Sequence, residues 1–172
     1  MASQTFLIMS DSHGDRAIVQ SLKERYQGHV TAIFHNGDSE LPADDPLWQG
    51  IFVVKGNCDT GNYPETQVHR LGDVTIAQTH GHLQGINFSW NRLDLFAQEA
   101  QADICLYGHL HVPAAWKSGS CLFVNPGSIS FPRGEIHEKL YALLTVDEQT
   151  ITVRYYNREH EEYLSLTTAF ER

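Results

Sequence analysis

The sequence predicts an α/β fold, and three observations lead to this prediction. Short apolar segments typical of buried strands alternate with segments whose apolar residues recur at helical spacing. Five of the apolar segments run directly into polar side chains that can bind a metal ion. The chain has 172 residues, of which 41% are hydrophobic, and this is enough for one domain with its own core. We therefore expect a single α/β domain over residues 1–172.

The first third of the chain predicts three strands and a helix. Residues 5–9 form a continuous apolar segment, which is typical of a buried strand. Asp15 follows at the position of a helix cap, and helical spacing continues to about Tyr26. Residues 30–34 and 51–54 are short and apolar, and we expect each to form another buried strand.

The rest of the chain predicts two hairpins, a second helix and further strands. Ser89 can cap a helix that continues to about residue 101. In the last third of the chain, the residues on both sides of the turn at 147–149 are continuously apolar or alternate between apolar and polar, which is typical of a hairpin. An edge strand is expected near residues 163–166. The remaining predicted strands are 66–71, 73–78, 103–107, 121–124, 139–146 and 150–156.

Composition and charge argue against several classes of protein. The formal net charge of −9 disfavours binding to a nucleic-acid polymer, whose backbone calls for a basic face. A small phosphorylated substrate stays compatible, because bound divalent cations would reverse the local charge. The first residues lack a basic signal-peptide region, and no segment has the length of a membrane span. The three cysteines form no paired framework, so we expect a cytoplasmic protein.

Polar side chains follow five of the predicted strands, at the end where α/β folds usually place their chemistry. They are Asp11 and His13, Asp38, Asn57, His80, and His109 and His111. Carboxylate, amide and imidazole groups together suit Mn²⁺, Fe or Zn²⁺. Because seven ligands exceed the needs of one ion, the pattern predicts two metal ions that share Asp38.

Each motif alone also has an ordinary structural explanation. Asp11 could cap the first helix with His13 in its first turn, and the pairs at 37–38 and 56–57 could be simple turns. His80 alone could be an ordinary loop histidine. The joint pattern favours metal binding, because all the members follow strands and their ligand types complement one another.

Two metal ions roughly 3.5–4 Å apart form a hydrolytic centre for phosphate esters. A hydroxide that bridges the ions would attack phosphorus in line, while the ions neutralise the phosphoryl oxygens. This chemistry needs no serine or cysteine nucleophile, and the sequence has neither a nucleophile elbow nor a phosphate-binding glycine loop with its lysine. The pattern predicts metal-dependent hydrolysis of a small phosphate ester.

The ordered motifs Asp-x-His, Gly-Asp, Gly-Asn-x-Asp, His-Gly-His and Gly-His-x-His resemble those of the calcineurin-like metallophosphoesterases. They are most similar to the small single-domain branch of YfcE-type phosphodiesterases, in which the Asn-Pro-Gly-Ser found at 125–128 is also typical. The resemblance implies a four-layer α-β-β-α sandwich with mixed sheets. It also implies one metal ion on Asp11, His13, Asp38 and His111, and a second on Asp38, Asn57, His80 and His109. Mn²⁺ is the first choice, with Ni²⁺, Fe²⁺ and Zn²⁺ as alternatives.

One position departs from the larger members of that superfamily, which carry Gly-Asn-His at the third motif. Cys58 stands there instead, and a thiol is a poor substitute for a histidine that acts on the leaving group or the phosphate. His82 is the next candidate to contact substrate, so Asp38, Asn57 and His82 are the predicted catalytic residues. Esters with good leaving groups should react best, because they need the least protonation.

Alternatives stay open for neighbouring residues and for the function. We expect His35 to pack beside the site without binding metal, Asp59 to support the loop of Asn57, and Arg133 to be a solvated loop residue. A protein-binding scaffold similar in fold to the retromer subunit Vps29 is the main alternative, although a scaffold needs no complete ligand set. A nuclease of the Mre11 type is disfavoured by the short, acidic chain. The substrate, its ester class and homo-oligomer formation cannot be read from the sequence.

Overall fold

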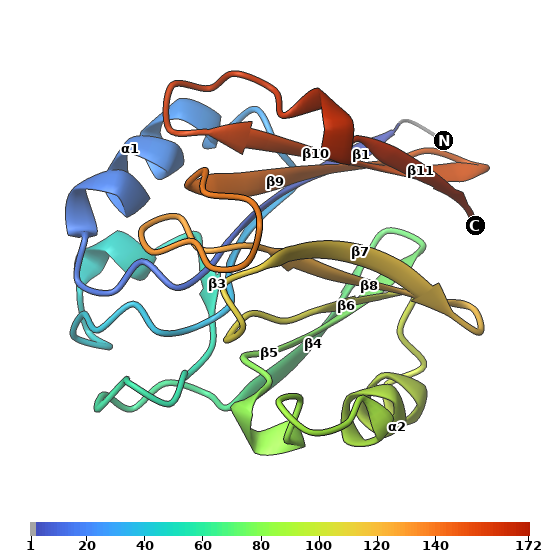
Figure 1. Cartoon of the computed structure of the whole chain (residues 1–172), viewed down its shortest axis with the longest axis horizontal. Helices are drawn as coiled ribbons and strands as arrows, with labels where there is room; N and C mark the ends of the chain where they lie inside the picture. The colour runs from blue at the N-terminus through green and yellow to red at the C-terminus, as the bar shows by residue number, and fades with distance from the viewer. Residues whose placement is uncertain (1–2) are drawn as a thin grey trace.

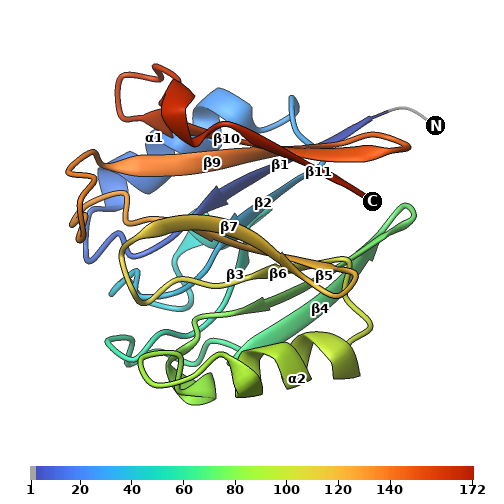
Figure 2. The same cartoon turned by 45° about the vertical axis from the view of Figure 1, so that its right-hand side comes forward.

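A computed structural model describes residues 3–172 of the chain (Figure 1). The strands form two sheets that pack face to face, and one helix covers the outer face of each sheet (Figure 2). The layers are α1 (Arg16–Tyr26), a six-stranded sheet A, a five-stranded sheet B and α2 (Asn91–Glu99). The predicted α/β class and the four-layer α-β-β-α arrangement with mixed sheets are confirmed.

Sheet A combines a parallel half with an antiparallel half. Its spatial order is β11 (Thr168–Glu171), β10 (Thr150–Asn157), β9 (Leu140–Val146), β1 (Gln4–Met9), β2 (Ala32–His35) and β3 (Phe52–Val53). Strands β1, β2 and β3 are parallel, whereas β9 pairs antiparallel with both β1 and β10. The carboxyl ends of β1, β2 and β3 therefore meet at one edge of the sheet.

Sheet B is mixed in the same way. Its spatial order is β4 (Thr66–Leu71), β5 (Val74–Thr79), β6 (Ile104–Leu106), β8 (Cys121–Pro126) and β7 (Pro113–Ser118). Strands β5, β6 and β8 are parallel, so the loops after β5 and β6 emerge at one edge. Asn36, just after β2, donates a hydrogen bond to the carbonyl of Tyr107, just after β6, at 2.9 Å. This contact joins the two edges.

Strand β1 illustrates why the predicted strands are continuous runs of apolar residues, in which apolar and polar residues do not alternate. Successive side chains of a strand point to opposite faces of the sheet. Phe6 and Ile8 belong to the core between the two sheets, while Leu7 and Met9 pack in the core that includes Leu22 of α1. Since both faces are covered, every position in β1 from Phe6 to Met9 is buried.

The start of α1 was predicted correctly, and the start of α2 was predicted one residue too early. Asp15 caps α1 as predicted, because its Oδ1 accepts the N–H of Ile18 at 3.2 Å. The cap of α2 is Trp90, one residue later than the predicted Ser89. Ser89 Oγ still accepts the N–H of Asn91 at 3.1 Å, so it satisfies the first helical donor from outside the helix.

One strand prediction is wrong and one strand was missed. The edge strand expected at residues 163–166 is wrong, because Leu164–Leu166 forms a short 3₁₀ turn and the edge strand β11 follows it. Strand β7 was not predicted, since its proline and two alanines are poor strand formers. Shorter 3₁₀ turns also lie at Pro46–Trp48 and His82–Gln84. Across residues 3–172, we find no helix with the length and hydropathy that a membrane span requires.

Candidate metal centre

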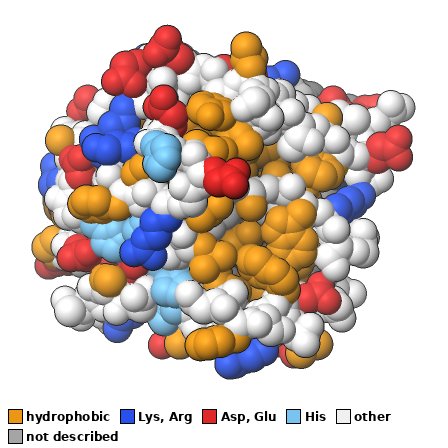
Figure 3. Space-filling view, viewed as in Figure 1, with side chains coloured by type: hydrophobic (Ala, Val, Ile, Leu, Met, Phe, Trp, Pro, Cys, Tyr) orange, Lys and Arg blue, Asp and Glu red, His pale blue; other side chains and the backbone are white. Residues whose placement is uncertain are grey.

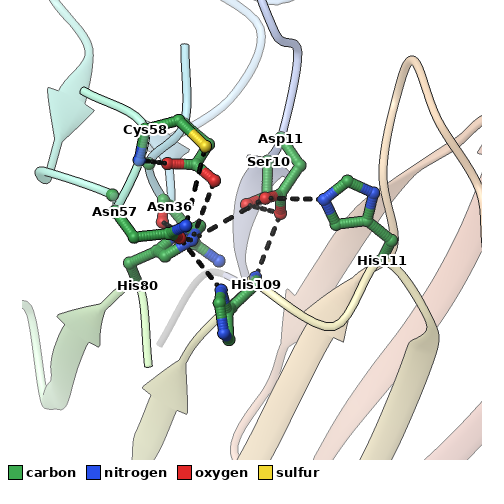
Figure 4. Close-up of polar contacts among 12 residues, drawn as sticks. Ser10, Asp11, Asn36, Asn57, Cys58, His80, His109 and His111 are labelled. Atoms are coloured by element: carbon green, nitrogen blue, oxygen red, sulfur yellow. Dashed lines mark hydrogen bonds and ion pairs between the residues drawn. The ribbon is translucent and has the colours of Figure 1, made fainter. Parts of the chain in front are cut away.

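The loops that follow β1, β2, β3, β5 and β6 converge at the joined edges of the two sheets (Figure 4). Backbone hydrogen bonds hold these loops together. The N–H of Asp11 donates to the carbonyl of Gly37 at 3.0 Å, and the N–H of Gly108 donates to the carbonyl of His80 at 2.9 Å. This convergence brings the seven predicted ligands into one cluster.

The first group of ligand atoms comes from Asp11, His13 and His111, and they all lie within 4.8 Å of one another. His111 Nε2 lies 3.2 Å from Asp11 Oδ1 and 3.2 Å from His13 Nε2. Asp38 Oδ2 is the next oxygen, 3.9 Å from His13 Nε2. The structure thus brings together the four residues that the resemblance assigns to one ion.

The second group comes from Asp38, His80 and His109, again within 4.8 Å of one another. His80 Nε2 lies 3.3 Å from Asp38 Oδ2. Asn57 Oδ1 lies 3.0 Å from both His80 Nε2 and His109 Nδ1. Asp38 therefore faces both groups, which is the position that a shared ligand needs.

Each of the four histidines in these groups has its outer ring nitrogen on an oxygen that can only accept a hydrogen bond. The pairs are His13 Nδ1 with Glu40 Oε1 at 2.6 Å, His80 Nδ1 with the Asn36 carbonyl at 2.7 Å, His109 Nε2 with Asn87 Oδ1 at 2.7 Å, and His111 Nδ1 with the Phe131 carbonyl at 2.7 Å. Such a partner places the ring proton on the outer nitrogen. The inner nitrogen of each ring then presents a lone pair to the centre of the cluster.

These residues fit divalent cations. With the outer nitrogens protonated, the lone pairs of His13 Nε2 and His111 Nε2 face each other at 3.2 Å, which is repulsive unless a positive charge lies between them. Asp11 Oδ1 is buried beside them and has no hydrogen-bond partner among the described residues. Buried oxygens without a partner are rare, and one explanation is an ion. Two imidazoles and a carboxylate at one point suit a divalent transition metal.

The charges of the cluster also favour cations. Burial alone would raise the pKa of Asp38, but the positive charge of His80, when its ring carries a second proton, and the N–H of Cys58 lower it below its usual range. Burial of Asp11 is likewise outweighed by His111 and His80, so its pKa is lowered. Burial and then Asp38 raise the pKa of the Cys58 thiol to about 11. Two carboxylates thus keep their negative charge in a largely buried site.

Backbone conformation is unusual at the same residues. Eight described residues other than glycine have a left-handed φ, and five of these are predicted ligands. The five are Asp11 at 55°, His13 at 44°, Asp38 at 58°, His109 at 72° and His111 at 60°. Such conformations cost energy for residues with a Cβ, and they gather where the surrounding structure enforces a functional geometry.

Asp59 supports this backbone as predicted. Its Oδ2 accepts the N–H of Gly56 at 2.7 Å and that of Asp38 at 2.9 Å. Its Oδ1 accepts the N–H of Glu40 at 2.8 Å. A single carboxylate therefore links the loops after β2 and β3, and so fixes the position of Asp38 relative to Asn57.

The other singled-out residues lie around the cluster. The ring of His82 packs 5.3 Å from that of His80 and 6.2 Å from that of His109, and its buried Nδ1 has no partner within residues 3–172. Its contact with substrate stays a prediction. Sequence reasoning missed Glu40 and Asn87, which hold the outer nitrogens of two ligands. No motif marked them, because each acts through the fold of its loop.

His35 lies beside the centre, and both of its ring nitrogens have partners outside the two ligand groups. It is fully buried, with Nε2 2.9 Å from Ser12 Oγ and Nδ1 accepting the N–H of Gly37 at 3.1 Å. Burial lowers the pKa of His35 to about 4. Between about pH 6.5 and pH 4 the unfolded chain therefore binds a proton at this position that the folded chain does not.

We expect this difference to destabilise the protein as the pH falls through that window. Unfolding in urea should show a loss on the order of 3 kcal/mol from His35 between pH 7 and pH 4. In His35→Gln this loss should disappear, whereas replacement of the exposed His29 by glutamine should leave it in place. Equal pH dependence in wild type and His35→Gln would contradict the assignment.

The residues of this cluster lie in a region that matches a known protein family. The profile of the Calcineurin-like phosphoesterase superfamily domain matches residues 5–149, which contain all seven predicted ligands. The chain belongs to this superfamily. The probable metallophosphoesterase YsnB of Bacillus subtilis (strain 168) is 38% identical over 157 residues, covering 91% of this chain and 92% of YsnB. Phosphodiesterase YfcE of Escherichia coli (strain K12) is 34% identical over 93 residues, covering 49% of this chain and 47% of YfcE.

Solved structures agree with this membership. A conserved uncharacterized protein from Streptococcus pneumoniae TIGR4, described as a predicted phosphoesterase, has a TM-score of 0.98 and 57% identity, covering 100% of this chain and 99% of the other. Wild-type Vps29 of Entamoeba histolytica, solved with Zn²⁺, has a TM-score of 0.72 and 21% identity, with 98% of each chain covered. That second likeness is one of fold alone. Family and relatives together support a hydrolase that uses divalent metal.

Proposed function

We propose that the protein is a cytoplasmic, dinuclear metal-dependent phosphodiesterase that hydrolyses a small phosphate ester. The observation that carries this proposal is the pair of ligand groups that face each other across Asp38, with imidazole lone pairs turned inward. Asp11, His13, Asp38 and His111 would hold one ion, and Asp38, Asn57, His80 and His109 the other. Bound there, the two ions would lower the pKa of a water molecule and neutralise phosphoryl oxygens. Mn²⁺ is the proposed metal, with Ni²⁺, Fe²⁺ and Zn²⁺ as alternatives.

The chain's own residues orient the ligands and meet the substrate. Glu40, Asn36, Asn87 and the Phe131 carbonyl fix the four imidazole rings through their outer nitrogens. Such partners around metal ligands typically matter by 10–100-fold in affinity or activity, as an order of magnitude. His82 packs against two of the rings, and we assign it a contact with the bound phosphate.

Arg133 supplies positive charge at the opening of the site. It lines a cavity of about 540 Å³ together with His13, Glu40, His111, Phe131 and Pro132. Arg133 is exposed, as the sequence predicted for a solvated loop residue, but the structure places it beside two predicted ligands. We expect Arg133→Gln to raise KM for an anionic ester about tenfold with little change in kcat, because it removes a charge-assisted contact. Arg70→Gln, on the exposed face of β4, should leave KM unchanged.

Hydrolysis of model esters tests the proposed function. Metal-stripped protein should cleave bis-p-nitrophenyl phosphate and p-nitrophenyl phosphate only after Mn²⁺ is added, and the ratio of the two rates gives the preferred ester class. The net charge of −9 supports a small ester over a nucleic-acid polymer. If the protein binds Mn²⁺, Ni²⁺, Zn²⁺ and Fe²⁺ but turns over neither ester with any of them, a Vps29-like scaffold becomes the better hypothesis.

A further inference from the structure

An apolar cavity of about 370 Å³ lies beside the metal centre. Its walls are Trp90, Tyr107, Leu110, Val112, Ala114 and Trp116. Figure 3 shows hydrophobic side chains gathered over β7, with histidine side chains next to them. The volume is at the lower end of the range for small-molecule sites, which suits one small group.

Two segments of the chain build both this cavity and the metal centre. Leu110 stands between His109 and His111, so the loop that carries two predicted ligands also forms a wall of the cavity. The second segment carries Asn87, which holds His109 Nε2 at 2.7 Å, and Trp90 three residues later. The cavity and the metal centre are therefore built from neighbouring residues of the same two segments.

The aromatic walls are held in place before any ligand binds. Trp116 Nε1 donates to Tyr107 Oη at 3.0 Å, and the Trp116 ring stacks on Phe123 with centroids 4.3 Å apart. The ring of Trp90 packs 5.1 Å from Trp116 and 5.7 Å from Tyr107, yet Trp90 stays 42% exposed. Because the Trp116 N–H already has Tyr107 as its acceptor and all six lining residues are uncharged, the cavity offers aromatic surface rather than charge.

We propose that this cavity binds a planar, uncharged aromatic group of the phosphate ester whose phosphate lies at the metal centre. This inference rests on the proposed function, since the metal centre supplies the phosphate site. Because the same two segments build the cavity and carry predicted ligands or their partners, a part of the substrate is favoured as the occupant over a second copy of the chain or another protein. The substrate class is then an aryl or nucleobase-containing ester, because planar rings stack on tryptophan and tyrosine without regard to their exact substituents.

Binding of phosphonates to the Zn²⁺-loaded protein tests the proposal without hydrolysis, because their carbon–phosphorus bond is not an ester. Benzylphosphonate should bind about tenfold more tightly than ethylphosphonate, given the usual strength of stacking on aromatic side chains. The indole N–H resonances of Trp90 and Trp116 should shift with benzylphosphonate. The buried Trp48, which is absent from the cavity, should shift least.

Three variants test whether the preference for benzylphosphonate over ethylphosphonate depends on the cavity. Trp90→Ala should abolish the preference for benzylphosphonate, and Trp90→Phe should restore most of it. Leu95→Ala, which removes an exposed apolar side chain of α2 outside the cavity, should retain the full preference. A preference that survives in Trp90→Ala would overturn the proposal, as would a wild-type dimer that Trp90→Ala converts to a monomer. Ester turnover is scored separately, so its absence with an intact preference would count against the proposed function alone.

Discussion

Replacing Asp38 with asparagine is expected to lower kcat/KM for ester hydrolysis by about 10²–10³-fold, as the loss of one central electrostatic group does in other enzymes. The side chain keeps its shape in this variant but loses its negative charge. Asp38 Oδ2 lies 3.3 Å from His80 Nε2 and 3.9 Å from His13 Nε2, so the lost charge faces both ligand groups. We therefore expect fewer bound ions per chain as well as slower turnover.

Metal content and activity measured on the same samples check this prediction. Asp45→Asn is the matched control, because Arg16 holds the pKa of Asp45 down to about 2 through an ion pair on the exposed start of α1. It removes a comparably ionised carboxylate away from the centre and should change neither quantity. Full metal content with unchanged turnover in Asp38→Asn would exclude Asp38 as the shared ligand.

The positions of the predicted ligands could be read from the sequence because each follows a buried strand. Asp11 lies shortly after the end of β1, and Asp38 and His80 lie shortly after the ends of β2 and β5. Parallel strands place their carboxyl ends at one edge, so residues far apart in sequence come together without any detailed knowledge of loops. The four-layer arrangement, and hence the packing of two sheets against each other, came from the family resemblance, whereas the order of the strands within each sheet was not predicted.

The supporting residues could not be predicted, because their roles depend on loop conformation. Glu40 reaches His13 because its own backbone adopts a φ of 55°. The residue type does not predict this left-handed conformation. Phe131 acts through its carbonyl, which every residue possesses. The aromatic cavity brings together Trp90, which precedes β6 in the chain, and Trp116, which follows it, and periodicity within one segment does not reveal such a pairing.

Gly56→Ala is expected to abolish metal binding, because the added Cβ displaces Asp38. A Cβ on Gly56 would lie 2.0 Å from Asp38 Oδ1 and 2.4 Å from the Asp38 backbone nitrogen. Neither atom can move freely, because Asp59 accepts the N–H groups of both Gly56 and Asp38, and Asp38 Oδ1 accepts the N–H of Cys58 at 2.8 Å. Overpacking of this kind costs about 1–3 kcal/mol of unfolding free energy, and Asp38 must shift to relieve it. We expect loss of metal binding and of most ester turnover.

Gly119→Ala gives a control with a similar cost in stability. Its φ of 60° makes the substitution costly by about 1–2 kcal/mol, but a Cβ there would have no atom within 4 Å. The free energy of unfolding of both variants, measured in urea, should fall by similar amounts, while only Gly56→Ala should lose metal and turnover. Normal metal content in Gly56→Ala would show that Asp38 can move without consequence for binding. A loss confined to Gly56→Ala would instead tie metal binding to the close approach of the loops after β2 and β3, which only a glycine at position 56 allows.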